Sequence, residues 1–208
     1  MTSLPLKFRS FQASSSKQPD RLLVALHGWG ANADDLVSLA PMLRLENYQF
    51  IFPEAPFDHP NVPDGKMWYD LQDFEVKAGL SESQTLLTEF LEALPDRMGI
   101  PLANTVLMGF SQGGAMTLDI GSRFPLAGLV CLSGYLHGEL SASDLPPVMI
   151  AHGVQDYVVP ITAARSTRDR LLMLDAQVDY QEYDMGHEIR PQVLERIREF
   201  VLGLKANV

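Results

Sequence analysis

Short runs of apolar residues recur along the chain, and several are apolar at nearly every position. Such runs lack the alternation of a half-exposed strand, so they predict strands that are buried on both faces. The stretches between them carry apolar residues at helical spacing. Strand alternating with helix predicts an α/β fold with a parallel sheet covered on both faces. The clearest strand-like runs are 22–26, 105–108, 129–132 and 148–151, and the helical stretches are 34–43, 80–94, 114–123, 161–174 and 191–204.

Three further segments extend this sheet. Residues 48–52 and 178–183 are rich in strand-forming side chains, whereas residues 6–12 alternate between apolar and polar and predict an antiparallel edge strand. The chain contains no repeat and no low-complexity block. With 208 residues it is long enough for one sizeable core, so we expect a single domain, 1–208.

One long segment, residues 53–79, follows neither pattern. It combines prolines and glycines with the aromatic residues Phe57, Trp68, Tyr69 and Phe74. Long irregular segments within compact domains are usually functional or disordered. The aromatic side chains favour an ordered wall beside a site.

The charge balance excludes some partners. The net charge of −10 repels nucleic acid and anionic lipid headgroups.

No apolar stretch approaches the roughly 20 residues needed to span a bilayer, and the first ten residues lack the apolar core of a signal peptide. The single cysteine, Cys131, lies in an apolar run and is expected to be a small buried side chain. We therefore expect a cytoplasmic protein without stable membrane insertion.

The pattern Gly-x-Ser-x-Gly at residues 109–113 is the strongest chemical signal. In a nucleophile elbow, the serine lies in a strained turn between a strand and a helix, and the glycines allow close backbone contacts. A strand-like run precedes Ser111 and a helical run follows it, which is the context that the motif requires. The alternative interpretation is a glycine-rich turn with an unreactive serine.

A serine nucleophile needs a histidine as base. In nucleophile-elbow hydrolases the base follows the serine and the acid in the chain. His187 meets this requirement, in a turn after the last predicted strand. His152 is the alternative, but its place at a strand end favours a structural role. The remaining histidines lie upstream of the serine or lack a convincing context; they are His27, His59 and His137.

A carboxylate must orient the base. Asp156 follows a central strand, at the edge of the sheet where catalytic groups of α/β folds gather. Asp184 is the alternative, although its closeness to His187 in the chain makes a turn residue more plausible. Glu139 and Asp144 lie in a polar connection and are expected to be solvated.

The glycine-rich turn at residues 26–30 ends the early strand and is similar to the turn that supplies an oxyanion-hole donor. The backbone N–H of Trp29 would be one donor, and that of Gln112 would be the second because it follows the nucleophile. Taken alone, this turn could also be an ordinary tight turn.

Together these motifs resemble the carboxylesterase and acyl-protein thioesterase family, also called phospholipase/carboxylesterase, within the α/β-hydrolases. The resemblance runs through nearly the whole chain in family order. Trp29 departs from it, because a leucine often occupies that position. The matching segments are residues 26–30, 53–56, 68–70, 109–114, 152–160 and 186–187.

The resemblance implies a small-molecule acyl ester or thioester as substrate, including lysophospholipids and S-acyl proteins. It implies no organic cofactor and no metal, and a possible homodimer. It places the acyl pocket beside Trp68, Leu71, Tyr135 and Val158, for each of which a core-packing role is the alternative. A binding protein that retains the hydrolase fold is the competing function; a peptidase or a dienelactone-type hydrolase is less well supported.

Overall fold

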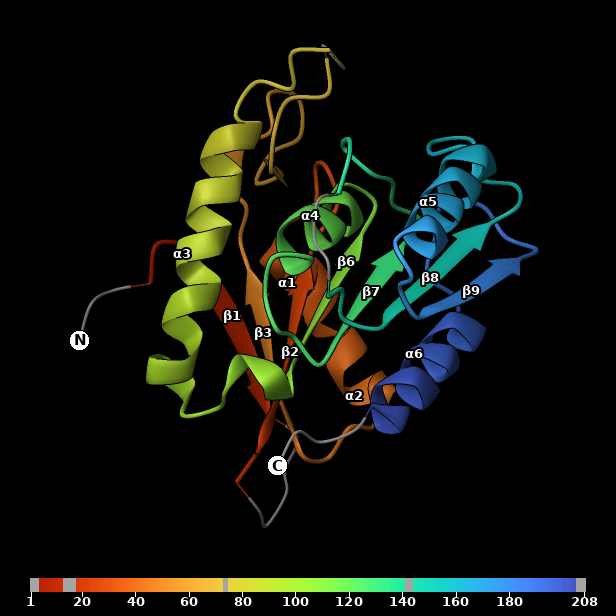
Figure 1. Cartoon of the computed structure of the whole chain (residues 1–208). Helices are drawn as coiled ribbons and strands as arrows, with labels where there is room; N and C mark the ends of the chain where they lie inside the picture. Colours follow the sequence, from red (N-terminus) through yellow and green to blue (C-terminus); the bar gives the residue numbers. More distant parts are fainter. Residues whose placement is uncertain (1–3, 13–17, 73–74, 141–143, 205–208) are drawn as a thin grey trace.

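The computed structural model describes residues 4–12, 18–72, 75–140 and 144–204. Its centre is a seven-stranded sheet with the strand order β1-β3-β2-β6-β7-β8-β9 (Figure 1). Among the described strands of this sheet, only β1 is antiparallel to its neighbour, which confirms the predicted antiparallel edge. The strands are β1 Phe8–Gln12, β2 Arg21–Leu26, β3 Tyr48–Pro53, β6 Thr105–Phe110, β7 Gly128–Leu132, β8 Val148–Gly153 and β9 Val178–Tyr183.

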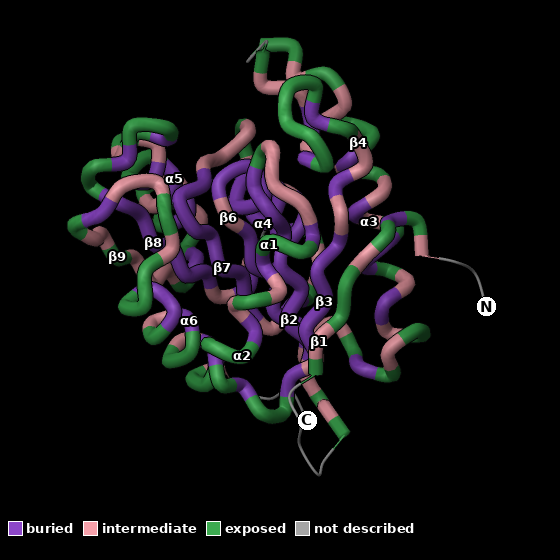
Figure 2. Tube along the Cα trace, turned by 180° about the vertical axis from the view of Figure 1, so that it is seen from behind, coloured by how far each residue is buried: buried purple, intermediate pink, exposed green. Residues whose placement is uncertain are grey.

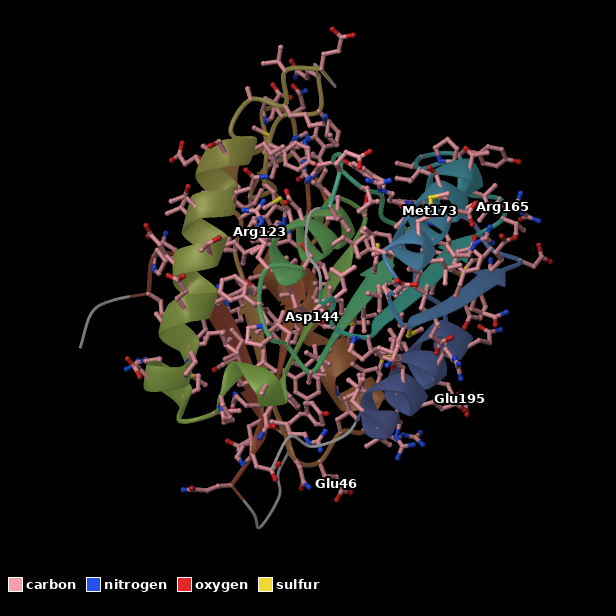
Figure 3. The ribbon with its side chains drawn as sticks, viewed as in Figure 1. Glu46, Arg123, Asp144, Arg165, Met173 and Glu195 are labelled. Carbon is pink, nitrogen blue, oxygen red and sulfur yellow. The ribbon has the colours of Figure 1, made fainter. Side chains whose placement is uncertain are left out.

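Helices cover both faces of this sheet, and Figure 2 shows its central strands as the buried centre of the molecule. One face packs against α3 (Leu80–Met98), α4 (Gln112–Gly121) and α5 (Ile161–Met173). The other packs against α1 (Ala33–Val37), α2 (Leu39–Leu43) and α6 (Pro191–Gly203). A short 3₁₀ helix, η1 (Leu102–Asn104), precedes β6. Charged side chains such as Glu46, Arg165 and Glu195 lie on the outside (Figure 3).

Strand β2 illustrates why its residues are apolar throughout. Leu22, Val24 and Leu26 belong to the core on the α3 side, whereas Leu23 and Ala25 belong to the core on the α6 side. Successive side chains of a strand point to opposite faces, so a strand with two covered faces needs an unbroken apolar run.

The central strand β6 is hydrogen-bonded on both sides. It pairs with β2 in the register Leu26↔Gly109 and with β7 in the register Phe110↔Leu132. These pairings hold the end of β6 level with the ends of its neighbours. Cys131, on β7, is fully buried, as predicted.

The predicted helix over 34–43 is in fact two short helices separated by Ser38. Asn32 caps α1 through its side chain, which accepts a hydrogen bond from the N–H of Asp34. Helix α3 is longer than predicted, because it continues past Pro95 to Met98. It ends where Gly99 adopts a left-handed conformation with φ of 70°.

The irregular segment over 53–79 contains a two-stranded ribbon, β4 (Phe57–Asp58) and β5 (Lys66–Met67). After this ribbon, Trp68 and Tyr69 are fully buried. The segment is therefore anchored in the core, while Phe74 lies outside the described residues. In the described part of the chain, no helix has both the length and the apolar character needed to cross a membrane.

Candidate active site

Ser111 occupies the turn between β6 and α4. Its backbone has φ of 56° and ψ of −118°, a conformation that L-residues rarely adopt, and its N–H donates a 2.8 Å hydrogen bond to the carbonyl of Leu132. The two motif glycines make this turn possible. A Cβ on Gly109 would lie 2.1 Å from the carbonyl oxygen of Gly113, and a Cβ on Gly113 would lie 2.3 Å from that of Leu26. The local geometry is that of a nucleophile elbow.

Asp156 and His187 form a hydrogen-bonded pair. The Nδ1 atom of His187 lies 2.7 Å from Oδ2 of Asp156. The other carboxylate oxygen accepts hydrogen bonds from the N–H groups of Val158 (2.9 Å) and Val159 (2.8 Å). Burial favours the neutral acid, but the hydrogen bonds from His187 and these amides outweigh it and lower the pKa of Asp156. The carboxylate is therefore ionised and fixed in position.

The imidazole of His187 lies beside the elbow. Its ring packs against Phe110, the residue before Ser111, with 4.7 Å between ring centroids. The loop that carries His187 contacts the loop that carries Asp156, since the N–H of Gln155 donates to the carbonyl of Met185 at 3.0 Å. The structure thus brings together three segments that are far apart in the chain.

The turn after β2 lies against Ser111. A Cβ built on Gly28 would be 3.4 Å from the Cβ of Ser111. Within the described residues, the N–H of Trp29 donates to no backbone carbonyl. Gln112 is the first residue of α4, and the first N–H groups of a helix have no partner within it. Both amides that were predicted as oxyanion donors therefore lack backbone partners next to Ser111.

The side chain of Gln112 has a role that the sequence did not reveal. It is fully buried, and its Oε1 accepts a 2.9 Å hydrogen bond from the N–H of Trp68. Its Nε2 donates to the carbonyl of Tyr69 at 2.7 Å. The residue after Ser111 therefore binds the segment of Trp68 and Tyr69 to the elbow.

Trp68 supports the turn after β2. Its indole N–H donates a 3.0 Å hydrogen bond to the carbonyl of His27, and its side chain has no exposed surface. These are the contacts of the core-packing alternative. Leu71 is partly buried against the core on the α3 side. In contrast, Val158 is 67% exposed, next to Asp156.

Two other histidines hold loops at this edge of the sheet. His27 donates from Nδ1 to the carbonyl of Gly28 and accepts from the N–H of Ala55 at Nε2. His152 lies 2.8 Å from the carbonyl of Val159, in the loop that presents Asp156. The contact of His152 fits the structural role expected from its place at a strand end.

Asp184 and His137 complete the set of candidates. Asp184 accepts a hydrogen bond from the exposed Gln155, which fits a turn residue. His137 has a defined environment that the sequence did not indicate. Its Nδ1 lies 3.0 Å from Asp119 and its Nε2 lies 2.7 Å from the hydroxyl of Tyr69. Only the folded chain brings these residues together.

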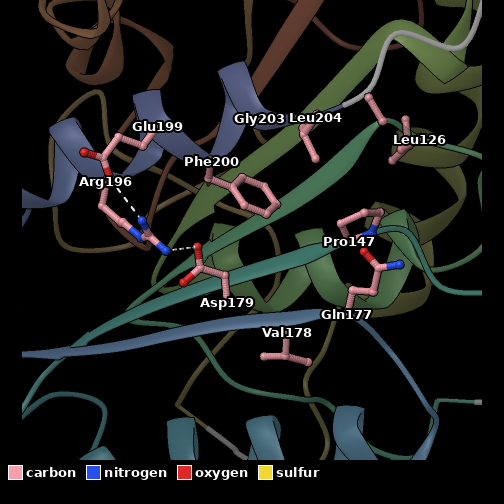
Figure 4. Close-up of a pocket in the computed structure, with 11 residues that line it drawn as sticks. Leu126, Pro147, Gln177, Val178, Asp179, Arg196, Glu199, Phe200, Gly203 and Leu204 are labelled. Atoms are coloured by element: carbon pink, nitrogen blue, oxygen red, sulfur yellow. Dashed lines mark hydrogen bonds and ion pairs between the residues drawn. The ribbon is translucent and has the colours of Figure 1, made fainter.

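A cavity of about 610 Å³ lies at the opposite edge of the sheet, where β8 and β9 begin (Figure 4). Arg196 spans part of it and is paired with Asp179 and Glu199. This cavity is remote from Ser111, which follows the other end of β6. Among the described residues, no cluster of His, Cys, Asp and Glu is arranged to hold a metal ion.

Comparison with known proteins shows the family of this chain. The sequence profile of the phospholipase/carboxylesterase family matches residues 10–204. The chain belongs to this family. As a member of the phospholipase/carboxylesterase family it is a carboxylesterase-like serine hydrolase with the α/β-hydrolase fold, so the predicted family, fold and enzyme class are confirmed.

Individual known proteins are similar over most of the chain. Acyl-protein thioesterase 1 of Neurospora crassa is 32% identical, and the match covers 84% of this chain and 80% of that protein. The crystal structure of esterase PE8 has a TM-score of 0.88 and 29% identity, and covers 96% of this chain and 99% of its own. SOBER1 from Arabidopsis thaliana, at 22% identity and a TM-score of 0.75, covers 88% of this chain and 97% of its own and shares the fold.

Proposed function

We propose that this esterase cleaves acyl esters and thioesters through an acyl-enzyme intermediate, with Ser111 as nucleophile, His187 as base and Asp156 as the group that orients the base. The observation that carries this proposal is the 2.7 Å contact between His187 Nδ1 and Asp156. An ionised carboxylate can only accept a hydrogen bond, so Nδ1 carries the proton. In the neutral imidazole, Nε2 is then left as the acceptor for the serine proton.

The reaction proceeds in two half-reactions. The oxygen of Ser111 attacks the acyl carbonyl while its proton passes to Nε2 of His187. When the carbonyl re-forms, the bond to the leaving alcohol or thiol breaks, and the imidazolium protonates that leaving group. Water then attacks the acyl-serine with His187 again as base, and the acid and free Ser111 are released. Asp156 stays ionised throughout and stabilises the imidazolium.

The N–H groups of Trp29 and Gln112 would stabilise the negative oxygen of the tetrahedral intermediate. Their lack of backbone partners beside Ser111 supports this role. A donor that is aimed at the developing charge contributes about 3 to 4 kcal/mol to the transition state. The acyl group would lie near Leu71, Tyr135 and Val158, with Trp68 supporting the wall from behind.

A thioester substrate is supported by the acyl-protein thioesterases among the relatives. Oxygen and sulfur leaving groups use the same nucleophile and the same oxyanion donors. The choice between them can be measured directly by comparing p-nitrophenyl butyrate with a butyryl thioester.

Labelling with a fluorophosphonate probe tests the proposal. The wild type should be labelled, and Ser111→Ala should lose both labelling and at least about 10⁴-fold in kcat. Ser122→Ala is the matched control, because Ser122 is a buried serine that follows the same helix and whose hydroxyl donates to the carbonyl of Asp119. A wild type that neither reacts with the probe nor hydrolyses either substrate would instead support a binding protein.

A further inference from the structure

A chain of hydrogen bonds runs through the core on the α3 side of the sheet. Asp119 Oδ2 lies 3.0 Å from His137 Nδ1, His137 Nε2 lies 2.7 Å from the Tyr69 hydroxyl, and the Tyr69 hydroxyl lies 2.6 Å from that of Tyr135. We call these four residues the Asp119 relay. Three elements contribute to it: helix α4, the segment after β5 and the loop after β7.

Most of the relay is shielded from water. Tyr69 has no exposed surface, and the side chains of His137 and Asp119 are 8% and 13% exposed. Tyr135 is intermediate in exposure and is the more open end. In a chain of hydrogen bonds without water, each bond needs one donor and one acceptor. A group that can only accept or only donate therefore fixes the roles of the groups that follow it.

Asp119 is the fixed acceptor. Burial opposes its ionisation, but hydrogen bonds from His137 and Gln84 outweigh that effect and lower the pKa of Asp119. Arg123 also lowers it. Burial raises the pKa of Tyr69 and of Tyr135, so both hydroxyls keep their protons at neutral pH.

When the imidazole of His137 is neutral, these constraints allow one arrangement of donors and acceptors along the Asp119 relay. His137 donates from Nδ1 to Asp119, so its Nε2 accepts the proton of the Tyr69 hydroxyl. The Tyr69 oxygen then accepts the proton of the Tyr135 hydroxyl. Tyr135 has used its only donor within the relay, and its oxygen therefore offers only lone pairs to any other group.

The open end of the relay is attached to the nucleophile turn. Ser111 donates its N–H to the carbonyl of Leu132, three residues before Tyr135. The neighbouring Gly134 packs on the first turn of α4, since a Cβ on Gly114 would be 3.2 Å from its Cα. The main chain of Tyr69 is bound by the side chain of Gln112. The relay is thus connected to the elbow at both of its tyrosines.

We propose that Asp119, His137 and Tyr69 are positioning residues that hold the Tyr135 hydroxyl as a hydrogen-bond acceptor for the substrate. This inference rests on the proposed function and refines its substrate class. Esters that carry an O–H or N–H donor close to the ester group are preferred over esters in which that donor is blocked.

A pair of esters that differ only in this donor tests the inference. 2-Hydroxyethyl butyrate has a free hydroxyl, and in 2-methoxyethyl butyrate a methyl group blocks it. We expect the wild type to favour the hydroxyl ester by about 5- to 10-fold in kcat/KM, the range of one net hydrogen bond. In Tyr135→Phe the ratio should fall to about 1.

Asp119→Asn probes the relay from its far end. Arg123 can only donate, whereas the amide of Gln84 can turn to present its oxygen, so the Asn oxygen faces Arg123 and its NH₂ group faces Gln84 and His137. Nδ1 then becomes an acceptor and Nε2 carries the proton, which reverses each following hydrogen bond. The Tyr135 hydroxyl now donates outward, and the ratio should fall to about 1 or below. A purely structural defect would lower both kcat/KM values and leave their ratio unchanged.

The controls separate this inference from the proposed function. Tyr48→Phe removes another buried tyrosine hydroxyl, at the opposite end of the sheet, and should keep the wild-type ratio. Thermal unfolding checks that each variant is folded. If Ser111 is labelled and both esters are hydrolysed, but the wild-type ratio is near 1 or both relay variants retain it, the relay inference is wrong and the proposed function stands. If the wild type neither labels nor hydrolyses, both are overturned.

Discussion

His187 and Asp156 are joined by a 2.7 Å contact, while the second oxygen of Asp156 is held by the N–H groups of Val158 and Val159. Both carboxylate oxygens are therefore committed, one to the ring and one to the backbone. The carboxylate cannot turn without breaking at least one of these contacts.

This arrangement predicts the effect of Asp156→Asn. The two backbone amides require an oxygen, so the new NH₂ group would face His187 and force the proton onto Nε2. That nitrogen could no longer accept the serine proton, and kcat should fall by about 10⁴-fold. KM and the circular dichroism spectrum should change little. A loss of less than about tenfold would argue against Asp156 as the orienting group.

Gln112→Ala should reveal the structural role of this side chain, because the substitution keeps the backbone N–H. The change leaves the N–H of Trp68 and the carbonyl of Tyr69 buried without their partner. We expect the free energy of unfolding to fall by about 2 to 4 kcal/mol in urea denaturation. Gln155→Ala is the control, because Gln155 is exposed and should change stability by less than about 0.5 kcal/mol. Equal stability of the two variants would contradict this role.

Gly113→Ala should disrupt the elbow itself. The added methyl group would lie 2.3 Å from the carbonyl oxygen of Leu26, a backbone atom that cannot move away cheaply. We expect a loss of more than about 3 kcal/mol in stability, or insoluble protein, together with loss of fluorophosphonate labelling. Gly203→Ala, at the end of α6, meets no atom within 4 Å and should be neutral or slightly stabilising. An active, stable Gly113→Ala variant would exclude the tight turn.

Cys131 should be chemically silent in the folded protein. Its thiol is fully buried on β7, and burial raises the pKa of Cys131 to about 12. Thiolate is the reactive species, so iodoacetamide at pH 8 should modify the native protein far more slowly than the protein in guanidinium. Mass spectrometry measures both rates. Comparable rates would show that the strand opens readily.

The sequence predicted the sheet well because each central strand is covered on both faces. The apolar runs at 129–132 and 148–151 match the pattern of strands that are buried on both faces. The break at Ser38 and the continuation of α3 past Pro95 were not predicted. Local periodicity contains no such information.

In the candidate site, too, some features follow from local sequence and others depend on contacts between distant residues. Ser111, Asp156 and His187 were predicted from a motif and from the order of strand ends, both of which are properties of the chain. The buried bonds of Gln112 and the surroundings of His137 depend on residues more than 15 positions away, such as Asp119 and Tyr69. No single segment contains that signal.

The paired strand β6 has a consequence for how damage to this enzyme would be expressed. A shift of one residue between β6 and its neighbours would move the Ser111 hydroxyl by about 3.3 Å and exchange the sides on which Leu107 and Met108 pack. Misplacement by as little as about 1 Å can cost 10²-fold in rate. The turnover rate should therefore respond to smaller displacements of the core than thermal unfolding does. Core substitutions beneath β6 should reduce kcat before they lower the midpoint of unfolding.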